Sequence, residues 1–176
     1  MIKSIISALA LTAIVAPQAS ANTFDRHNHL IDMVKATGVE FKINPTECDT
    51  MNAMGWFMTY RNGHQEMVIC QENKIKGSTR QVRWTAEDLD TIRHEAHHLT
   101  QDCMDGSRNG ALGAVYKRPI ELGYKVMGQA KTNWVAESYA ENGASGHIQV
   151  MEIEAFAVAQ MNDPIDQAND IRRYCF

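Results

Sequence analysis

The sequence has no long apolar run, no block of like charges, no internal repeat and no linker rich in serine and glycine. Proline is scarce, at 4 of 176 residues, beside 11 glycines, 44% hydrophobic and 22% charged residues. These proportions exclude a disordered, collagen-like or low-complexity chain and indicate a globular one. The formal net charge is −4 and no basic cluster is present, so we do not expect nucleic acid as a partner.

The main apolar segment, residues 5–16, is too short to cross a bilayer. Lys3 precedes it and Ala19-Ser20-Ala21 follows it, an arrangement typical of a secretory signal peptide cleaved after Ala21. We therefore expect residues 1–21 to be removed and residues 22–176 to form one domain with no stable membrane anchor. The expected location is secreted or periplasmic.

The cysteines form no C-x-x-C pair, which argues against a structural zinc ribbon. Four cysteines in an exported chain predict two disulfides, for which three connectivities exist. We favour Cys48–Cys70, expected to join neighbouring strands, and Cys103–Cys175, expected to tie the C-terminal segment to the helix ahead of it.

The hydrophobic pattern predicts strands in the first half of the chain and helices in the second. Asn62-Gly63 is typical of a hairpin turn between two of the strands. A helix is expected over 24–37, strands over 39–43, 56–61 and 66–71, and a loop over 73–83. This order predicts an α+β domain with a small antiparallel sheet followed by a helical bundle.

A further helix is predicted to begin after Thr85, whose side chain can cap it, and to end at Asp105-Gly106. Its apolar residues recur every three or four positions and so form one stripe that faces a core. The stripe consists of Leu89, Ile92, Ala96, Leu99 and Cys103.

The same helix contains His94-Glu95-Ala96-His97-His98, a match to H-E-x-x-H. His94 and His98 are four residues apart, so both imidazoles project from one helix face and can bind one metal ion. Glu95 is about 100° round the helix from His94, which suits a general base beside the metal. His97 points away from Glu95 and has no predicted role.

A third ligand is needed, because catalytic zinc usually takes three protein ligands and one water. The segment from Ile148 to Met161 is apolar except for two carboxylates, Glu152 and Glu154. Buried carboxylates are costly unless they are paired or bind a metal, so this helix is the expected source. The two side chains diverge by about 200°, so one is expected to reach the metal and the other to bond a ligand histidine.

These motifs resemble the zincin metallopeptidases, in particular the gluzincin-like group, which place H-E-x-x-H on one helix and glutamate within E-x-x-A on a later one. Glu152-Ile153-Glu154-Ala155 matches E-x-x-A from Glu152, and Gln101 matches an H-x-x-Q extension of some small zincins. The resemblance implies a zincin-like fold and Glu152 as the third ligand, with Glu154 as the fallback. The chain departs from the group at Phe156, where many gluzincins have Asp or Asn.

The resemblance implies an exported peptidase that hydrolyses peptide bonds of a peptide or protein substrate. His94, His98 and Glu152 would hold Zn²⁺, and Glu95 would be catalytic. Tyr139 or His147 could stabilise the oxyanion. The alternative is a secreted zincin-fold metal-binding or toxin-like protein without general proteolytic activity, which the small size of the chain and the absence of room for a propeptide favour.

Overall fold

A computed structural model describes residues 19–176, and the apolar segment expected to be the core of a signal peptide lies outside this range. The expected cleavage after Ala21 would fall within the first helix. In chain order the elements are α1 (Ala19–Ala36), β1 (Glu40–Ile43), the 3-10 helix η1 (Thr46–Asp49), β2 (Gly55–Thr59), β3 (Gln65–Ile69), α2 (Ala86–Asp102), α3 (Pro119–Met127), α4 (Gln129–Glu141), α5 (Gly146–Met161) and α6 (Pro164–Cys175). No helix within residues 19–176 is both long and apolar enough to cross a membrane.

The three strands form a mixed sheet in the order β1-β3-β2. The predicted hairpin is confirmed, since β2 pairs with β3 antiparallel and Gly63 takes the positive φ of 81° that its turn requires. The expectation of a purely antiparallel sheet is wrong, because β1 pairs with β3 parallel, with Phe41 opposite Met67. After β1 the chain continues through η1 to β2, which forms the opposite edge of the sheet. The next strand, β3, then lies between β1 and β2.

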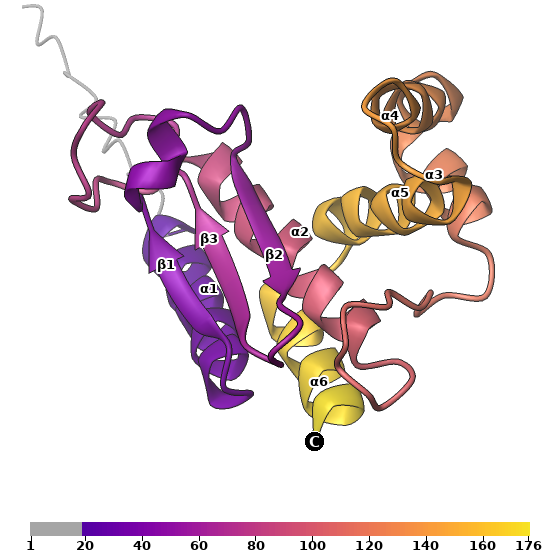
Figure 1. Cartoon of the computed structure of the whole chain (residues 1–176), viewed down its shortest axis with the longest axis horizontal. Coiled ribbons are helices and arrows are strands. Elements are labelled where there is room, and N and C mark those ends of the chain that lie inside the picture. The colour runs from indigo at the N-terminus through magenta and orange to yellow at the C-terminus, as the bar shows by residue number, and fades with distance from the viewer. Residues whose placement is uncertain (1–18) are drawn as a thin grey trace, which may run out of the picture.

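One face of the sheet packs against α1 and α2, which lie behind it in Figure 1. Alternate strand residues turn to this side, and α2 contributes the predicted apolar stripe, of which all but the half-buried Leu89 are fully buried. The shared core contains Leu30, Val34, Val39, Met67, Ile69, Ile92, Ala96, Leu99, Cys103, Ala168 and Ile171. This core holds α2, with its histidine motif, in a fixed position against the sheet.

The start of α2 confirms the predicted cap. Thr85 Oγ1 accepts from the backbone N–H of Asp88 at 3.1 Å, and Asp88 Oδ2 accepts from the backbone N–H of Thr85 at 2.9 Å. Asp88 Oδ1 also accepts from the backbone of Glu72, which joins the long loop to the helix start. The helix ends at Asp102, ahead of the expected Asp105-Gly106, because the next bonds span only three residues. The backbone N–H of Met104 donates to the carbonyl of Gln101, and that of Gly106 donates to the carbonyl of Cys103.

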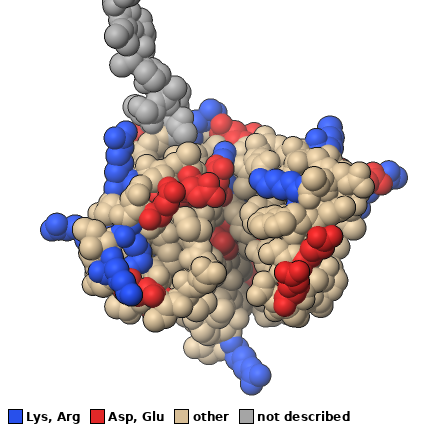
Figure 2. All heavy atoms as spheres, turned by 90° about the horizontal axis from the view of Figure 1, so that it is seen from above, with Lys and Arg blue, Asp and Glu red and all other residues tan. Residues whose placement is uncertain are grey.

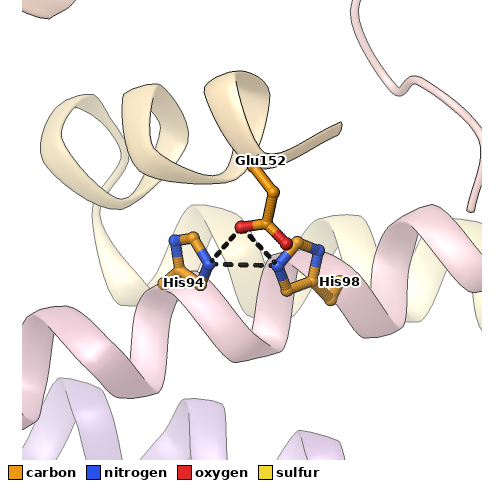
Figure 3. A group of neighbouring side chains, drawn as sticks. All are labelled: His94, His98 and Glu152. Carbon is orange, nitrogen blue, oxygen red and sulfur yellow. Dashed lines mark hydrogen bonds and ion pairs between the residues drawn. The ribbon is translucent and has the colours of Figure 1, made fainter. Parts of the chain in front are cut away.

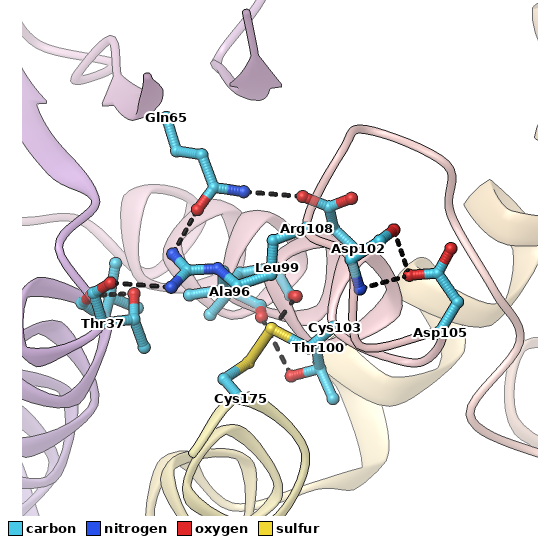
Figure 4. Close-up of a disulfide and its surroundings, with 12 residues drawn as sticks. Thr37, Gln65, Ala96, Leu99, Thr100, Asp102, Cys103, Asp105, Arg108 and Cys175 are labelled. Atoms are coloured by element: carbon cyan, nitrogen blue, oxygen red, sulfur yellow. Dashed lines mark hydrogen bonds between the residues drawn. A yellow bond between two sulfur atoms is a disulfide. The ribbon is translucent and has the colours of Figure 1, made fainter. Parts of the chain in front are cut away.

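Both favoured disulfide pairings are confirmed. Cys103, at the end of α2, bonds Cys175 at the end of α6, as expected for a tie between the C-terminal segment and the earlier helix (Figure 4). Cys48 lies on η1 rather than on a strand, and Cys70 follows β3, so the expectation that the first bond joins neighbouring strands is wrong. This disulfide instead fixes the connection between β1 and β2 against the end of the sheet.

The helices α3, α4 and α5 form a second group beside the sheet, on the right of Figure 1. In this group α5 contacts α2, α3 and α4. Gly123 lets α3 approach closely, since a β-carbon there would lie 2.5 Å from Ile153 Cγ2. The predicted apolar helix is confirmed as α5, in which residues 151–155 and 157–159 are buried. The contact between α2 and α5 joins the two groups and brings their polar residues together.

Candidate metal centre

Three side chains from α2 and α5 meet at one point, as Figure 3 shows. His94 Nε2 and His98 Nε2 lie 3.0 Å apart. Glu152 Oε2 lies 3.1 Å from the first nitrogen and 3.4 Å from the second. All three residues are buried, and they form one of two groups among the described residues that could hold a metal ion. The structure therefore brings together the two histidines of the motif and Glu152, not Glu154.

The electrostatics of this triangle are dominated by burial and by the carboxylate. Burial by itself lowers the pKa of His98, but the charge of Glu152 and its hydrogen bond outweigh this effect and raise that pKa to about 9. Burial raises the pKa of the Glu152 carboxyl, yet His98 and His94 together lower it overall. The carboxylate is therefore ionised and available as a ligand.

Glu95 is 6% exposed and lines the same cleft as His94. Burial is the main reason that the pKa of its carboxyl is raised, with Glu152 adding to the effect. A hydrogen bond from the backbone of Phe57, on β2, opposes the rise and holds the carboxylate beside the sheet. A carboxylate with a raised pKa next to a metal site can accept a proton from water.

The two residues expected to stabilise an oxyanion lie in different places. Tyr139, on α4, lines the cleft with His94 and Glu95. Burial, followed by the charge of Glu152, raises the pKa of its phenol, so the hydroxyl stays protonated and can donate. His147 is exposed at the start of α5, with Nε2 2.7 Å from the carbonyl of Leu112, and does not line the cleft.

A second buried cluster, not predicted from the sequence, lies behind the triangle. His97 Nε2–H donates to Glu154 Oε1 at 2.8 Å, and both side chains are almost fully enclosed. Burial lowers the pKa of His97, and Glu154 only partly offsets this. Gln101 donates to the same carboxylate oxygen and lies 2.8 Å from His98 Nδ1. The prediction that the second glutamate bonds a ligand histidine is therefore wrong, because Glu154 bonds His97, which is not in the triangle.

The cleft beside the triangle has a volume of about 490 Å³. Its walls come from the segment before β2, the first half of α2, and the facing sides of α4 and α5. Figure 2 shows a hollow in the middle of the molecular surface, with atoms of acidic residues visible inside it. Gly55 borders the cleft and cannot carry a side chain without a shift, since a β-carbon there would lie 2.7 Å from Thr91 Cγ2 and from the carbonyl of Val68. This close approach places β2 directly against Glu95.

The chain belongs to the family described as Domain of unknown function (DUF8637), whose profile matches residues 22–176. No curated protein and no solved structure matches the chain.

Proposed function

We propose that this protein is an exported zinc-dependent peptidase similar to the gluzincin-like zincins. The observation that carries the proposal is the triangle of His94, His98 and Glu152. Zinc bonds of about 2.0–2.1 Å in a tetrahedral site separate neighbouring ligand atoms by about 3.3 Å. The three separations of 3.0, 3.1 and 3.4 Å agree with that spacing. Two imidazoles and a carboxylate are also a donor set that zinc prefers in catalytic sites.

Zn²⁺ bound by these residues supplies a water of lowered pKa and a Lewis acid for the scissile carbonyl. Glu95 accepts the proton of the attacking water, because its carboxylate is held in the cleft next to His94 and its pKa is raised. The same carboxyl then delivers the proton to the leaving amine as the C–N bond breaks. Tyr139 donates a hydrogen bond to the oxygen on which negative charge develops.

The expected substrate is a peptide or protein in extended conformation. The strand β2 is at the edge of the sheet, so its outer backbone groups have no strand partner among residues 19–176 and can pair with an added strand. Gly55, the first residue of β2, borders the cleft that contains His94 and Glu95. A peptide paired with β2 would therefore pass the proposed catalytic residues.

The two disulfides are compatible with an oxidising compartment, which supports the proposed export. The proposed location is secreted or periplasmic.

A second candidate is a secreted zincin-fold metal-binding or toxin-like protein without general proteolytic activity. The observation that favours it is Phe156, which occupies the position of the Asp or Asn of many gluzincins. Its ring packs on His94, with centroids 4.4 Å apart, and His94 Nδ1 is buried with no hydrogen-bond partner in the described part of the chain. A histidine whose second ring nitrogen makes no hydrogen bond is held less firmly in the orientation that binds a metal.

Two variants test the proposal in the protein without residues 1–21. His98→Ala should lose both bound zinc and hydrolysis of peptides in a broad library, because it removes a ligand. Glu95→Gln should keep the zinc, since Glu95 is outside the triangle, and lose activity by about 100-fold or more. An active Glu95→Gln variant would contradict the mechanism, whereas a wild type that binds zinc but cleaves no peptide would favour the second candidate.

A further inference from the structure

We infer that Gln101 is a positioning residue that determines which ring nitrogen of His98 faces the metal; the inference rests on the proposed metal centre. Gln101 is fully buried on α2, nearly one turn after His98. Its side chain contacts α5 on one side and the imidazole of His98 on the other.

The contacts with α5 determine the orientation of the amide. One end of the amide lies 3.0 Å from the carbonyl oxygen of Met151 and 3.2 Å from Glu154 Oε1. A carbonyl and an ionised carboxylate can only accept hydrogen bonds, so this end must be the NH₂ group, which has two protons to donate. The other end is therefore the oxygen Oε1.

The orientation of the amide then determines the form of His98. Gln101 Oε1 lies 2.8 Å from His98 Nδ1, and a carbonyl oxygen can only accept. A proton must therefore be on Nδ1, so the lone pair is on Nε2 whenever the ring is neutral. This nitrogen is the one that faces His94 and Glu152, at 3.0 and 3.4 Å. Gln101 thus presents the nitrogen that the metal requires.

Glu154 keeps the amide in place through contacts that leave its carboxylate little freedom. Besides His97 and Gln101, Oε1 accepts from the backbone N–H of Val115, and Oε2 accepts from that of Tyr116. These bonds also hold the loop between α2 and α3 against α5. The route from this loop to the metal centre therefore runs through Glu154, Gln101 and His98.

The other histidine of the triangle has no such support. His94 Nδ1 is buried without a hydrogen-bond partner within the described residues, and the ring of Phe156 lies against its imidazole. The two ligand histidines are therefore held in different ways, one by a hydrogen bond and the other by apolar packing. An effect of Gln101 should accordingly appear at His98 and not at His94.

The test uses protein labelled with ¹⁵N-histidine, with and without zinc. Long-range ¹H–¹⁵N spectra of the metal-free wild type, recorded above pH 9 where the ring is neutral, should show a proton on His98 Nδ1 and none on Nε2. In the loaded state they should show zinc on Nε2. Gln101→Leu removes the acceptor but keeps most of the volume. It should speed exchange of the His98 Nδ1 proton and weaken zinc binding by about 10- to 100-fold in chelator competition.

Thr100→Val is the matched control. Thr100 is buried one residue earlier on the same helix, and its hydroxyl donates to the carbonyl of Ala96 rather than to a residue of the triangle. Thr100→Val should leave the His98 spectrum and the zinc affinity unchanged, even if it lowers the melting temperature as much as Gln101→Leu does. Gln101→Met serves as a second variant if the branched side chain prevents folding.

The outcomes separate this inference from the proposed function. Zinc bound by the wild type through His98 Nδ1 would overturn the role of Gln101 and leave the metal centre standing. So would a Gln101→Leu variant with wild-type zinc affinity and proton exchange. A wild type that binds no zinc overturns the proposed function, and an unprotonated His98 Nδ1 in its metal-free spectrum would overturn the role of Gln101 by itself.

Discussion

The ring of Phe156 packs against the imidazole of His94, with centroids 4.4 Å apart and planes inclined by 58°. The two residues come from α5 and α2, so this contact lies at the junction of the two groups of elements. It also lines the cleft. Phe156 therefore takes part in three features at once: the helix contact, the orientation of His94 and the shape of the cleft.

Replacing Phe156 by alanine should weaken zinc binding and lower the free energy of unfolding by about 2 kcal/mol, less than for a fully buried phenylalanine because this ring is partly exposed. The affinity falls because His94 would lose the packing that holds its ring. Phe156→Leu is the control, since it retains an apolar contact and should remain close to the wild type. Chelator competition and urea unfolding measure the two effects, and equal zinc affinity in all three proteins would contradict the role of this contact.

Glu152 and Glu154 should respond unequally to truncation. Glu152→Ala should abolish tight zinc binding, because it removes one charge and one of three donors. Glu154→Ala should weaken zinc binding less, by about 10- to 100-fold, through Gln101. It should also destabilise the fold, since it leaves the backbone groups of Val115 and Tyr116 without their acceptor. Metal content and thermal unfolding distinguish the two, and the reverse order of zinc affinities would exchange their roles.

Gly55→Ala should reduce peptidase activity without removing zinc. The added β-carbon would lie 2.7 Å from Thr91 Cγ2 and 3.4 Å from Glu95 Cγ, so β2 must move away from α2. A shift of this kind should lower kcat/KM by about 10- to 100-fold, because the substrate strand moves relative to Glu95. Gly146→Ala is the control, since a β-carbon there meets nothing within 4 Å. Activity of Gly55→Ala equal to that of this control would show that the close approach has no catalytic consequence.

The two disulfides should differ in what their loss changes. The Cys103–Cys175 bond spans 72 residues and should contribute about 4 kcal/mol to stability, against about 3 kcal/mol for Cys48–Cys70, which spans 22. Serine replacement of Cys103 and Cys175 should lower the melting temperature with little change in KM. Serine replacement of Cys48 and Cys70 should raise KM, because residues 52–54, which line the cleft, follow Cys48 closely in the chain. Mass spectrometry of the non-reduced protein checks both bonds, and four free thiols would contradict the structure.

Stability should fall in acid partly through Glu66. Burial raises the pKa of this carboxyl, but hydrogen bonds from Lys42, Tyr60 and Trp56 outweigh it and lower the pKa from 4.5 to about 2. The folded protein then binds fewer protons than the unfolded chain between these values, so the contribution of Glu66 is present above pH 4.5 and is lost as the pH falls toward 2.

Glu66→Gln should remove this part of the pH dependence. Urea unfolding at a series of pH values measures it, with the wild type and variant curves converging as the pH falls. Glu40→Gln is a matched control, because this glutamate also pairs with Lys42 but is exposed. Parallel curves for the wild type and Glu66→Gln would contradict the assignment.

The sequence by itself determined the features that depend on neighbouring residues. The spacing of His94 and His98 places both on one helix face, Thr85 caps that helix, and Asn62-Gly63 turns the hairpin. Each depends on backbone geometry within a few residues, which holds in any tertiary context. The number of cysteines likewise limits the possible disulfide connectivities to three.

Only the tertiary structure decided which elements lie side by side and in what rotation. Alternation of apolar residues predicts strands but not their neighbours, so β1 was expected to be antiparallel and is parallel to β3. The apolar pattern of α5 left both glutamates open, and only the resemblance to E-x-x-A favoured Glu152 over Glu154. The rotation of α5 on α2 brings Glu152 to the histidines and Glu154 to His97. Long-range packing sets that rotation, because the burial of a whole helix face outweighs the preference of any single residue.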